Sequence, residues 1–181
     1  VDLRATGELR PISGAFNLAL DGTANDLRLG ISTADPLLVG ITRITGRLAR
    51  TVDGFLADGF RLESDRASFS ADGPFATEAA DFGFEAAIAD LANITERAGG
   101  RLTATGRAQG SAGNLALSLE AAVPRGRLLD KELTEAALAF NGTLQDDVLA
   151  GQIAGSAFLA GVRADIETDV RLSAEERQLS G

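Results

Sequence analysis

The feature that most constrains this chain is a repeated alternation of apolar and polar residues at period two. Successive side chains of a β-strand point to opposite faces, so this alternation predicts strands with one apolar and one polar face. Clear examples are residues 16–21, 115–120 and 162–166, the last continuing to 170–172. Residues 27–31 alternate in the same way and are also predicted to form a strand. The pattern therefore predicts an all-β chain.

Turn-forming dipeptides separate many of these segments. Asp-Gly, Asn-Gly and Gly-Gly pairs favour positive φ in tight turns, and they occur at residues 21–22, 53–54, 58–59, 72–73, 99–100 and 141–142. At the usual spacing of roughly 8–12 residues per strand, about twelve strands are expected. We expect an elongated, repetitive sheet folded into a taco-like or sandwich groove with an apolar interior.

Two segments could instead be helical. Residues 76–98 are rich in Ala and Glu, which are good helix formers, and one helical face in the second segment would gather Leu129, Leu133, Ala136, Ala137 and Phe140. However, Gly83 would weaken a helix, and the residues around it alternate at period two. We therefore favour strands for most of both segments, with one short helix as an alternative.

Weak internal repeats suggest how the chain is organised. Residues 22–29 resemble residues 110–117, residues 45–48 resemble 141–144, and the triplet Gly-x-Leu recurs at Gly7, Gly46, Gly100 and Gly142. Such self-similarity is typical of solenoid-like architectures in which each repeat packs on its neighbours. We expect one continuous β-repeat domain over residues 1–181, with a first unit at about 1–98 and a second at about 99–181.

Composition argues against several classes of function. Lys and Arg number 17 against 26 Asp and Glu, a net charge of −9, whereas binding to phosphate backbones depends on clustered Lys and Arg. We therefore expect no nucleic-acid partner. Histidine and cysteine are absent, which excludes Ser-His-Asp and Cys-His catalysis and His or thiolate metal sites. We expect no enzyme activity, no metal and no organic cofactor.

Two acidic pairs are the remaining candidates for chemistry, Asp146-Asp147 and Glu175-Glu176. Paired carboxylates could act as acid and base in glycoside hydrolysis or could bind calcium. Adjacent acids in polar loops are more often simply solvated. We favour that interpretation for both pairs.

The ends of the chain indicate a part of a larger protein, and its short apolar runs indicate that any membrane anchor lies outside these residues. The first residue is Val1, and no apolar run approaches the roughly 20 residues that span a bilayer. We interpret the chain as an interior segment of a longer, repetitive protein.

The repeat pattern of residues 20–29, 34–38 and 44–48, and of the similar segment 100–117, resembles the TamB family of the AsmA-like superfamily. This resemblance implies a long β-taco with a hydrophobic lumen in the periplasm of a Gram-negative bacterium. It implies that phospholipid is carried between the inner and outer membranes, with a link to outer-membrane protein assembly. It also implies an inner-membrane anchor outside these residues and an outer-membrane barrel partner that contacts other parts of the protein.

The inward residues of such a sheet would line a lipid groove together with neighbouring repeats of the same chain. Twelve strands about 4.8 Å apart would give a trough roughly 55–60 Å long, in which a buried methylene gains about 0.8 kcal/mol. The candidates for contact with acyl chains are Phe16, Leu18, Leu20, Leu27, Leu29, Ile31, Ile44, Leu48, Leu62, Phe69, Phe82, Phe84, Ile88, Leu102, Leu115, Leu117, Leu119, Leu138, Phe140, Leu144, Ile153, Val162, Ile166, Val170 and Leu172.

Two questions stay open from the sequence. The same apolar residues could form a dry core, in which case the chain would be a structural β-solenoid or an adhesin or passenger module. Arginines could contact lipid headgroups at the rim of a groove or could simply face water, which we favour; these are Arg47, Arg50, Arg61 and Arg66.

Overall fold

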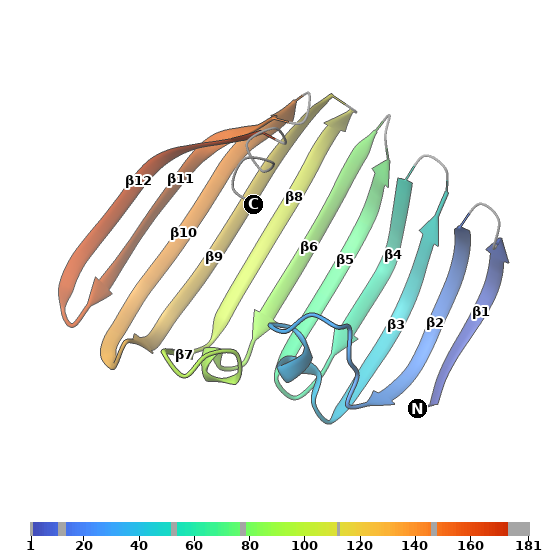
Figure 1. The fold of residues 1–181 in the computed structure, drawn as a ribbon, viewed down its shortest axis with the longest axis horizontal. Coiled ribbons are helices and arrows are strands. Elements are labelled where there is room, and N and C mark those ends of the chain that lie inside the picture. Colours follow the sequence, from blue (N-terminus) through green and yellow to red (C-terminus); the bar gives the residue numbers. More distant parts are fainter. Residues whose placement is uncertain are drawn as a thin grey trace.

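The computed structural model describes residues 2–10, 14–51, 54–76, 79–111, 113–145 and 148–173, and over these residues it is a single β-sheet (Figure 1). The prediction of an all-β chain with about twelve strands is confirmed. The strands are β1 (Asp2–Arg10), β2 (Ala15–Asn25), β3 (Ile41–Arg50), β4 (Gly54–Glu63), β5 (Ala67–Ala76), β6 (Ala80–Ile88), β7 (Ala98–Gly100), β8 (Leu102–Ser111), β9 (Asn114–Leu128), β10 (Lys131–Gln145), β11 (Val148–Leu159) and β12 (Val162–Ser173).

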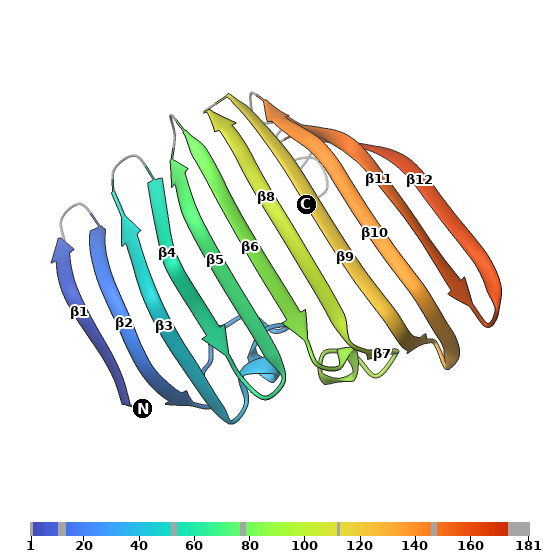
Figure 2. The same cartoon turned by 180° about the vertical axis from the view of Figure 1, so that it is seen from behind.

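The sheet is an antiparallel meander. Eleven strands follow one another in chain order, and the short β7 lies off this path and pairs with β9. β1 and β12 lie at opposite edges, so the described sheet stays open (Figure 2). Eleven strands at about 4.8 Å spacing extend about 50 Å across the sheet, slightly less than expected for twelve.

Strands replace helices in both segments where the sequence allowed either. β6 (Ala80–Ile88) lies in the first segment, which also contains a short 3-10 turn, and β10 covers most of the second. The helical content is limited, in the described residues, to two 3-10 turns, η1 (Asp35–Leu38) and η2 (Leu91–Asn93). η2 begins after Asp90, whose carboxylate accepts hydrogen bonds from the backbone N–H groups of Ala92 and Gly100. Both hydrogen bonds lower the pKa of Asp90.

The prediction of a strand at residues 27–31 is wrong, because this segment belongs to the loop between β2 and β3 that contains η1. Asp26 adopts a positive φ of 51°, and its carboxylate accepts a hydrogen bond from the Gly40 N–H at 2.9 Å. The Asp35 carboxylate likewise accepts the Leu29 N–H at 2.7 Å. The bond to Leu29 occupies a backbone N–H that a strand at residues 27–31 would need, and the bond to Gly40 closes the loop before β3.

The η1 loop folds over the lower end of the sheet. Leu38 is buried there, and its carbonyl accepts a hydrogen bond from the Thr42 hydroxyl, which is fully buried. The loop is also held by Ser64, which donates to the Leu37 carbonyl, and by Arg66, which donates to the Pro36 carbonyl. The face of β3 that carries Thr42 and Ile44 is therefore covered at this end.

Most of the dipeptides predicted to form turns lie inside strands instead. Residues 21–22 are in β2, 58–59 in β4, 72–73 in β5, 99–100 in β7 and 141–142 in β10, while Asp53 lies outside the described residues. At these positions glycine lets neighbouring strands approach closely or allows an irregularity in the strand. It does not reverse the direction of the chain. At 58–59, for example, the Asp-Gly pair forms a β-bulge.

The bulge in β4 keeps apolar side chains on one face. Thr45 pairs with Arg61 and Arg47 with Asp58, so Gly46 alone opposes Gly59 and Phe60. The extra residue resets the alternation, and Phe60 therefore shares a face with Ala57 rather than opposing it. Gly59 has a φ of 55°, and its N–H donates to the Asp72 carboxylate at 2.8 Å.

No break in the sheet marks a boundary between two units. Ile88 of β6 pairs directly with Leu102 of β8 across the expected division. The similar sequences at 22–29 and 110–117 also occupy different places, because the first runs from β2 into the η1 loop and the second from the end of β8 into β9. One continuous sheet is observed, and the division into two units stays a prediction.

Candidate functional site: an uncovered apolar face

One face of the sheet is apolar across all eleven strands of the path. Directly opposed residues of antiparallel strands share a face, so the pairings trace rows across the sheet. One such row runs without interruption through Gly22, Ile44, Leu62, Phe69, Ala86, Ala104, Ala121, Leu138, Gly155 and Ile166. We call this side of the sheet the apolar face and the other side the polar face.

The structure brings most of the sequence-based candidates together on the apolar face. By register and alternation these are Phe16, Leu18, Leu20, Ile44, Leu48, Leu62, Phe69, Phe82, Phe84, Ile88, Leu102, Leu115, Leu117, Leu119, Leu138, Phe140, Leu144, Ile153, Val162, Ile166, Val170 and Leu172. Leu27, Leu29 and Ile31 do not join them, because they lie in the η1 loop.

Sequence reasoning missed three phenylalanines of this face, Phe55, Phe60 and Phe75. Phe55 pairs with Phe75, and Phe60 lies edge-on to Phe69 with ring centroids 6.3 Å apart. The alternation of Phe69, Ala71, Gly73 and Phe75 could have revealed Phe75. Phe60 was not selected from the sequence, because the Asp-Gly pair before it predicts a turn rather than a strand.

The apolar face has no second layer of protein over most of its area. The described strands form one layer (Figures 1 and 2), and none of the nine phenylalanines is fully buried. Phe55 is 50% exposed, Phe75 41%, Leu138 39% and Ile166 53%. Large apolar side chains rarely remain this exposed over a contiguous area unless the surface binds something.

Aromatic rings cover glycines within the apolar face. The Phe84 ring lies over Gly106 on β8, where an added Cβ would approach the ring Cζ to 2.6 Å. The Phe140 ring covers Gly142 and Gly151 in the same way, with corresponding distances of 2.6 and 2.8 Å. Phe69 also stacks on Phe84 with ring centroids 6.0 Å apart. These contacts protect the backbone at glycine and fix the ring positions.

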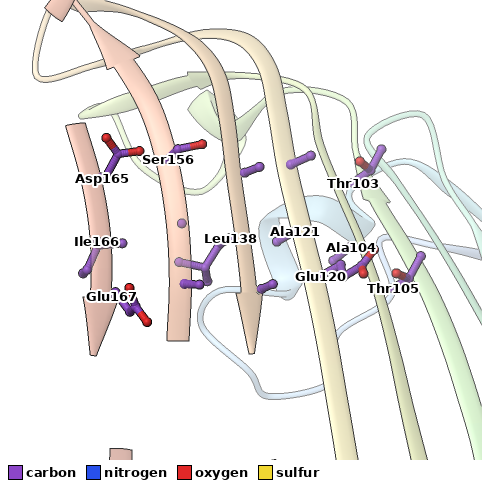
Figure 3. A pocket seen from close by; sticks show the side chains of 15 residues that line it. Thr103, Ala104, Thr105, Glu120, Ala121, Leu138, Ser156, Asp165, Ile166 and Glu167 are labelled. Carbon is purple, nitrogen blue, oxygen red and sulfur yellow. The ribbon is translucent and has the colours of Figure 1, made fainter. Parts of the chain in front are cut away.

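The polar face carries charged and hydroxyl side chains, and its two larger hollows have volumes of about 760 and 710 Å³. Polar side chains that line the larger hollow come from β8, β9 and β12 and include Thr103, Glu120, Asp165 and Glu167. Alternation along β12 puts Asp165 and Glu167 on the other face from Ile166, and Figure 3 shows the side chains that line this hollow. The described apolar face is therefore a broad open surface, while these hollows lie on the polar side.

An exposed ion pair on the polar face is expected to make stability depend on pH. Arg107 donates to the Asp81 carboxylate at 2.8 Å and Gln109 donates at 3.2 Å, and these bonds lower the pKa of Asp81 below its ordinary 3.8. A lowered pKa stabilises the fold at higher pH, and this contribution is lost as pH falls through the folded-state pKa.

We therefore expect Asp81→Asn to lower the urea midpoint slightly at neutral pH and to leave it unchanged once the pH is below the folded-state pKa. Urea unfolding over a pH series measures this effect. Arg107→Gln removes the main donor and should reproduce the same pH dependence. An equal effect of Asp81→Asn at every pH would contradict the ion-pair explanation.

The four arginines considered at the sequence level fall in three environments. Arg47 and Arg61 lie on the polar face, which agrees with the favoured interpretation that they face water. Arg66 binds the η1 loop through the Pro36 carbonyl. Arg50 lies beside the apolar face, with its guanidinium 5.4 Å from the centroid of the Phe55 ring. Arg50 is therefore the candidate best placed to meet a headgroup.

Asp146-Asp147 and Glu175-Glu176 lie outside the described residues. Across the residues that are described, no three acidic side chains gather in a way that could hold a metal ion. Within the same residues, no helix has the length and apolarity to cross a membrane.

The fold and the site define a class: an open, single-layer antiparallel sheet with one continuous apolar face. Comparison of the chain with protein-family models, with curated proteins and with solved structures finds no match. The resemblance to the TamB family therefore stays a hypothesis based on the repeat pattern.

Proposed function

We propose that this chain is a segment of a periplasmic bridge that shields phospholipid acyl chains on its apolar face during transport between the inner and outer membranes. The observation that carries the proposal is the uncovered apolar face, which continues from one edge of the sheet to the other. As in the family that the sequence resembles, the work of the parent protein would be linked to outer-membrane protein assembly.

The chemistry of the face suits an acyl chain better than a polar ligand. A methylene that is fully buried gains about 0.8 kcal/mol, and one that lies on an open surface gains about half of that. A dozen methylenes would therefore gain about 5 kcal/mol. The interior of the face offers few polar groups that would hold a ligand at one place, which favours movement along the surface, while Arg50 could meet a headgroup at its margin.

The alternative is a structural solenoid or adhesin module with a dry core. A dry core would bury the phenylalanines, whereas all nine keep some exposure in the described structure. The exposed face therefore favours the lipid-binding proposal over the structural one. The two proposals differ in a direct observable, which is the presence of lipid on the purified protein.

Lipid should remain with the protein when it is purified from bacterial membranes under mild conditions. We expect native mass spectrometry to detect adducts with the masses of phospholipids. Delipidated protein should regain them from vesicles. Protein that stays free of lipid in both experiments would contradict the proposal and favour the structural alternative.

Photo-crosslinking identifies the face that meets the lipid. A photoreactive residue at Phe84 or Leu117 lies on the apolar face, and one at Arg61 lies on the polar face and serves as the control. We expect phospholipid to crosslink at the first two positions and not at the third. Equal crosslinking at all three would indicate nonspecific association and would contradict binding by the apolar face.

A further inference from the structure

One row of the apolar face contains a positive charge. This row lies near the upper ends of the strands in Figure 1, and the pairings run through Leu9, Phe16, Arg50, Phe55 and Phe75. Arg50 is exposed, and among the described residues of β2 to β6 it is the only charged residue on this face. β3 is paired on both sides, with β2 and β4, so Arg50 lies within the sheet and not at an edge.

The surroundings of Arg50 do not neutralise its charge. Its guanidinium lies 5.4 Å from the centroid of the Phe55 ring, and this cation–π contact supplies no negative charge. Over the described residues no carboxylate forms an ion pair with Arg50. By contrast, the Arg47 guanidinium on the polar face of the same strand lies 4.0 Å from the Asp58 carboxylate. An arginine in this position is suited to an anion, and its fork of N–H donors matches phosphate.

The η1 loop limits the apolar face at the other end of β3. Leu38 of this loop is buried, and Thr42 is fully buried with its hydroxyl bonded to the Leu38 carbonyl. Ile44, the next residue on the same face, is also buried and lies six residues from Arg50. At about 3.4 Å per residue, this interval is about 20 Å long. Acyl chains occupy about 15 Å of one leaflet, half of a hydrocarbon core of about 30 Å, so they fit within it.

We propose that a phospholipid lies along β2 to β4 with its phosphate bound to Arg50 and its acyl chains directed toward the η1 loop. This inference rests on the function proposed above and adds the position and direction of the lipid. The acyl chains pack on the apolar side chains between the two ends, which include Leu18, Leu48 and Phe60. The phosphate stays at the margin of the face, where water and Arg50 both solvate it.

Comparison of two lipids with the same acyl chains isolates the contribution of the phosphate. Phosphatidylglycerol carries a phosphate and diacylglycerol does not, and both can be offered together in micelles of a nonionic detergent. We expect native mass spectrometry to show about fivefold more phosphatidylglycerol than diacylglycerol on the unmodified chain, because Arg50 binds only the first. Arg50→Gln should remove this preference and leave the uptake of diacylglycerol unchanged.

Arg47→Gln is the matched control, because it removes the same charge from the polar face of the same strand. This variant should keep the preference for phosphatidylglycerol, and circular dichroism of both variants checks the fold. Inorganic phosphate at the same concentration as the lipid should displace none of it, because it offers no acyl chain. Displacement would indicate a site for free phosphate and would contradict the proposal.

The possible results separate this inference from the proposed function. Equal uptake of the two lipids by the unmodified chain, or an unchanged preference in Arg50→Gln, would overturn the role of Arg50. Binding of acyl chains by the apolar face would still stand in both cases. If neither lipid were bound, both proposals would be contradicted.

Single tryptophans test the direction of the lipid, since the chain has no tryptophan of its own. Phe55→Trp places an indole beside Arg50, and Leu62→Trp places one opposite Ile44 near the η1 loop. Bromine on an acyl chain quenches tryptophan fluorescence on contact. We expect phospholipid brominated near the carboxyl end of its chains to quench Phe55→Trp more strongly. Bromine near the methyl end should quench Leu62→Trp more strongly, and the reverse order or equal quenching would overturn the proposed direction.

Discussion

Substitution of Gly46 by alanine is expected to destabilise the protein by about 3 kcal/mol. Gly46 has a φ of 104°, which side chains with a Cβ rarely adopt. An added Cβ would also collide with the Gly59 carbonyl and approach the Phe60 Cα to 2.6 Å. Both contacts are with backbone, so rotation of a side chain cannot relieve them. The bulge that keeps Phe60 on the apolar face would have to move.

Gly83→Ala is the matched control for this prediction. Gly83 also lies within a strand, but its φ is not positive and an added Cβ would approach only the Gly106 carbonyl, at an ordinary 3.8 Å. We expect this variant to be neutral or slightly stabilised, because alanine restricts the unfolded chain. Urea unfolding of the two variants gives the comparison. Equal losses of stability in both would contradict the role assigned to the bulge.

The sequence predicted the strands better than the connections between them. Alternation at period two depends only on the neighbours of a residue along the chain, and it correctly placed β9 and β12, for example. The same rule failed at residues 27–31, where the Asp26 and Asp35 carboxylates bind backbone N–H groups of the loop. Those bonds join residues 6 and 14 positions apart, and the alternation of neighbouring residues contains no information about them.

The composition of the candidate site was also predictable in part. Most of the apolar residues selected from the sequence share one face, because neighbouring strands pair in a register that puts the apolar residues of both on the same side. Phe60 was missed, since Asp58-Gly59 is equally suited to a turn and to a bulge. Only the register with Gly46 and the hydrogen bond to Asp72 distinguish the two. These depend on strands that are separate in the sequence.

A carboxylate placed in the apolar face is expected to reduce phospholipid binding about tenfold, because acyl chains would have to pack against an unpaired charge. Leu138 is the position for this test. Its side chain is 39% exposed, and its neighbours in the cross-strand row are the small residues Ala121 and Gly155. A glutamate at this partly exposed position can turn its carboxylate toward water, so Leu138→Glu should fold normally.

Ala137→Glu is the matched control, because it adds the same charge one residue away on the polar face. Ala137 lies opposite Ala122 and Ser156, which carry no charge, and its side chain is exposed. We expect this variant to bind phospholipid from vesicles as the unmodified chain does. Native mass spectrometry of both variants after exposure to vesicles measures the difference. If Leu138→Glu kept its lipid, or if Ala137→Glu lost lipid equally, contact between acyl chains and the apolar face would be contradicted. The comparison isolates the face of the sheet as the cause, since the two variants share net charge and position along β10.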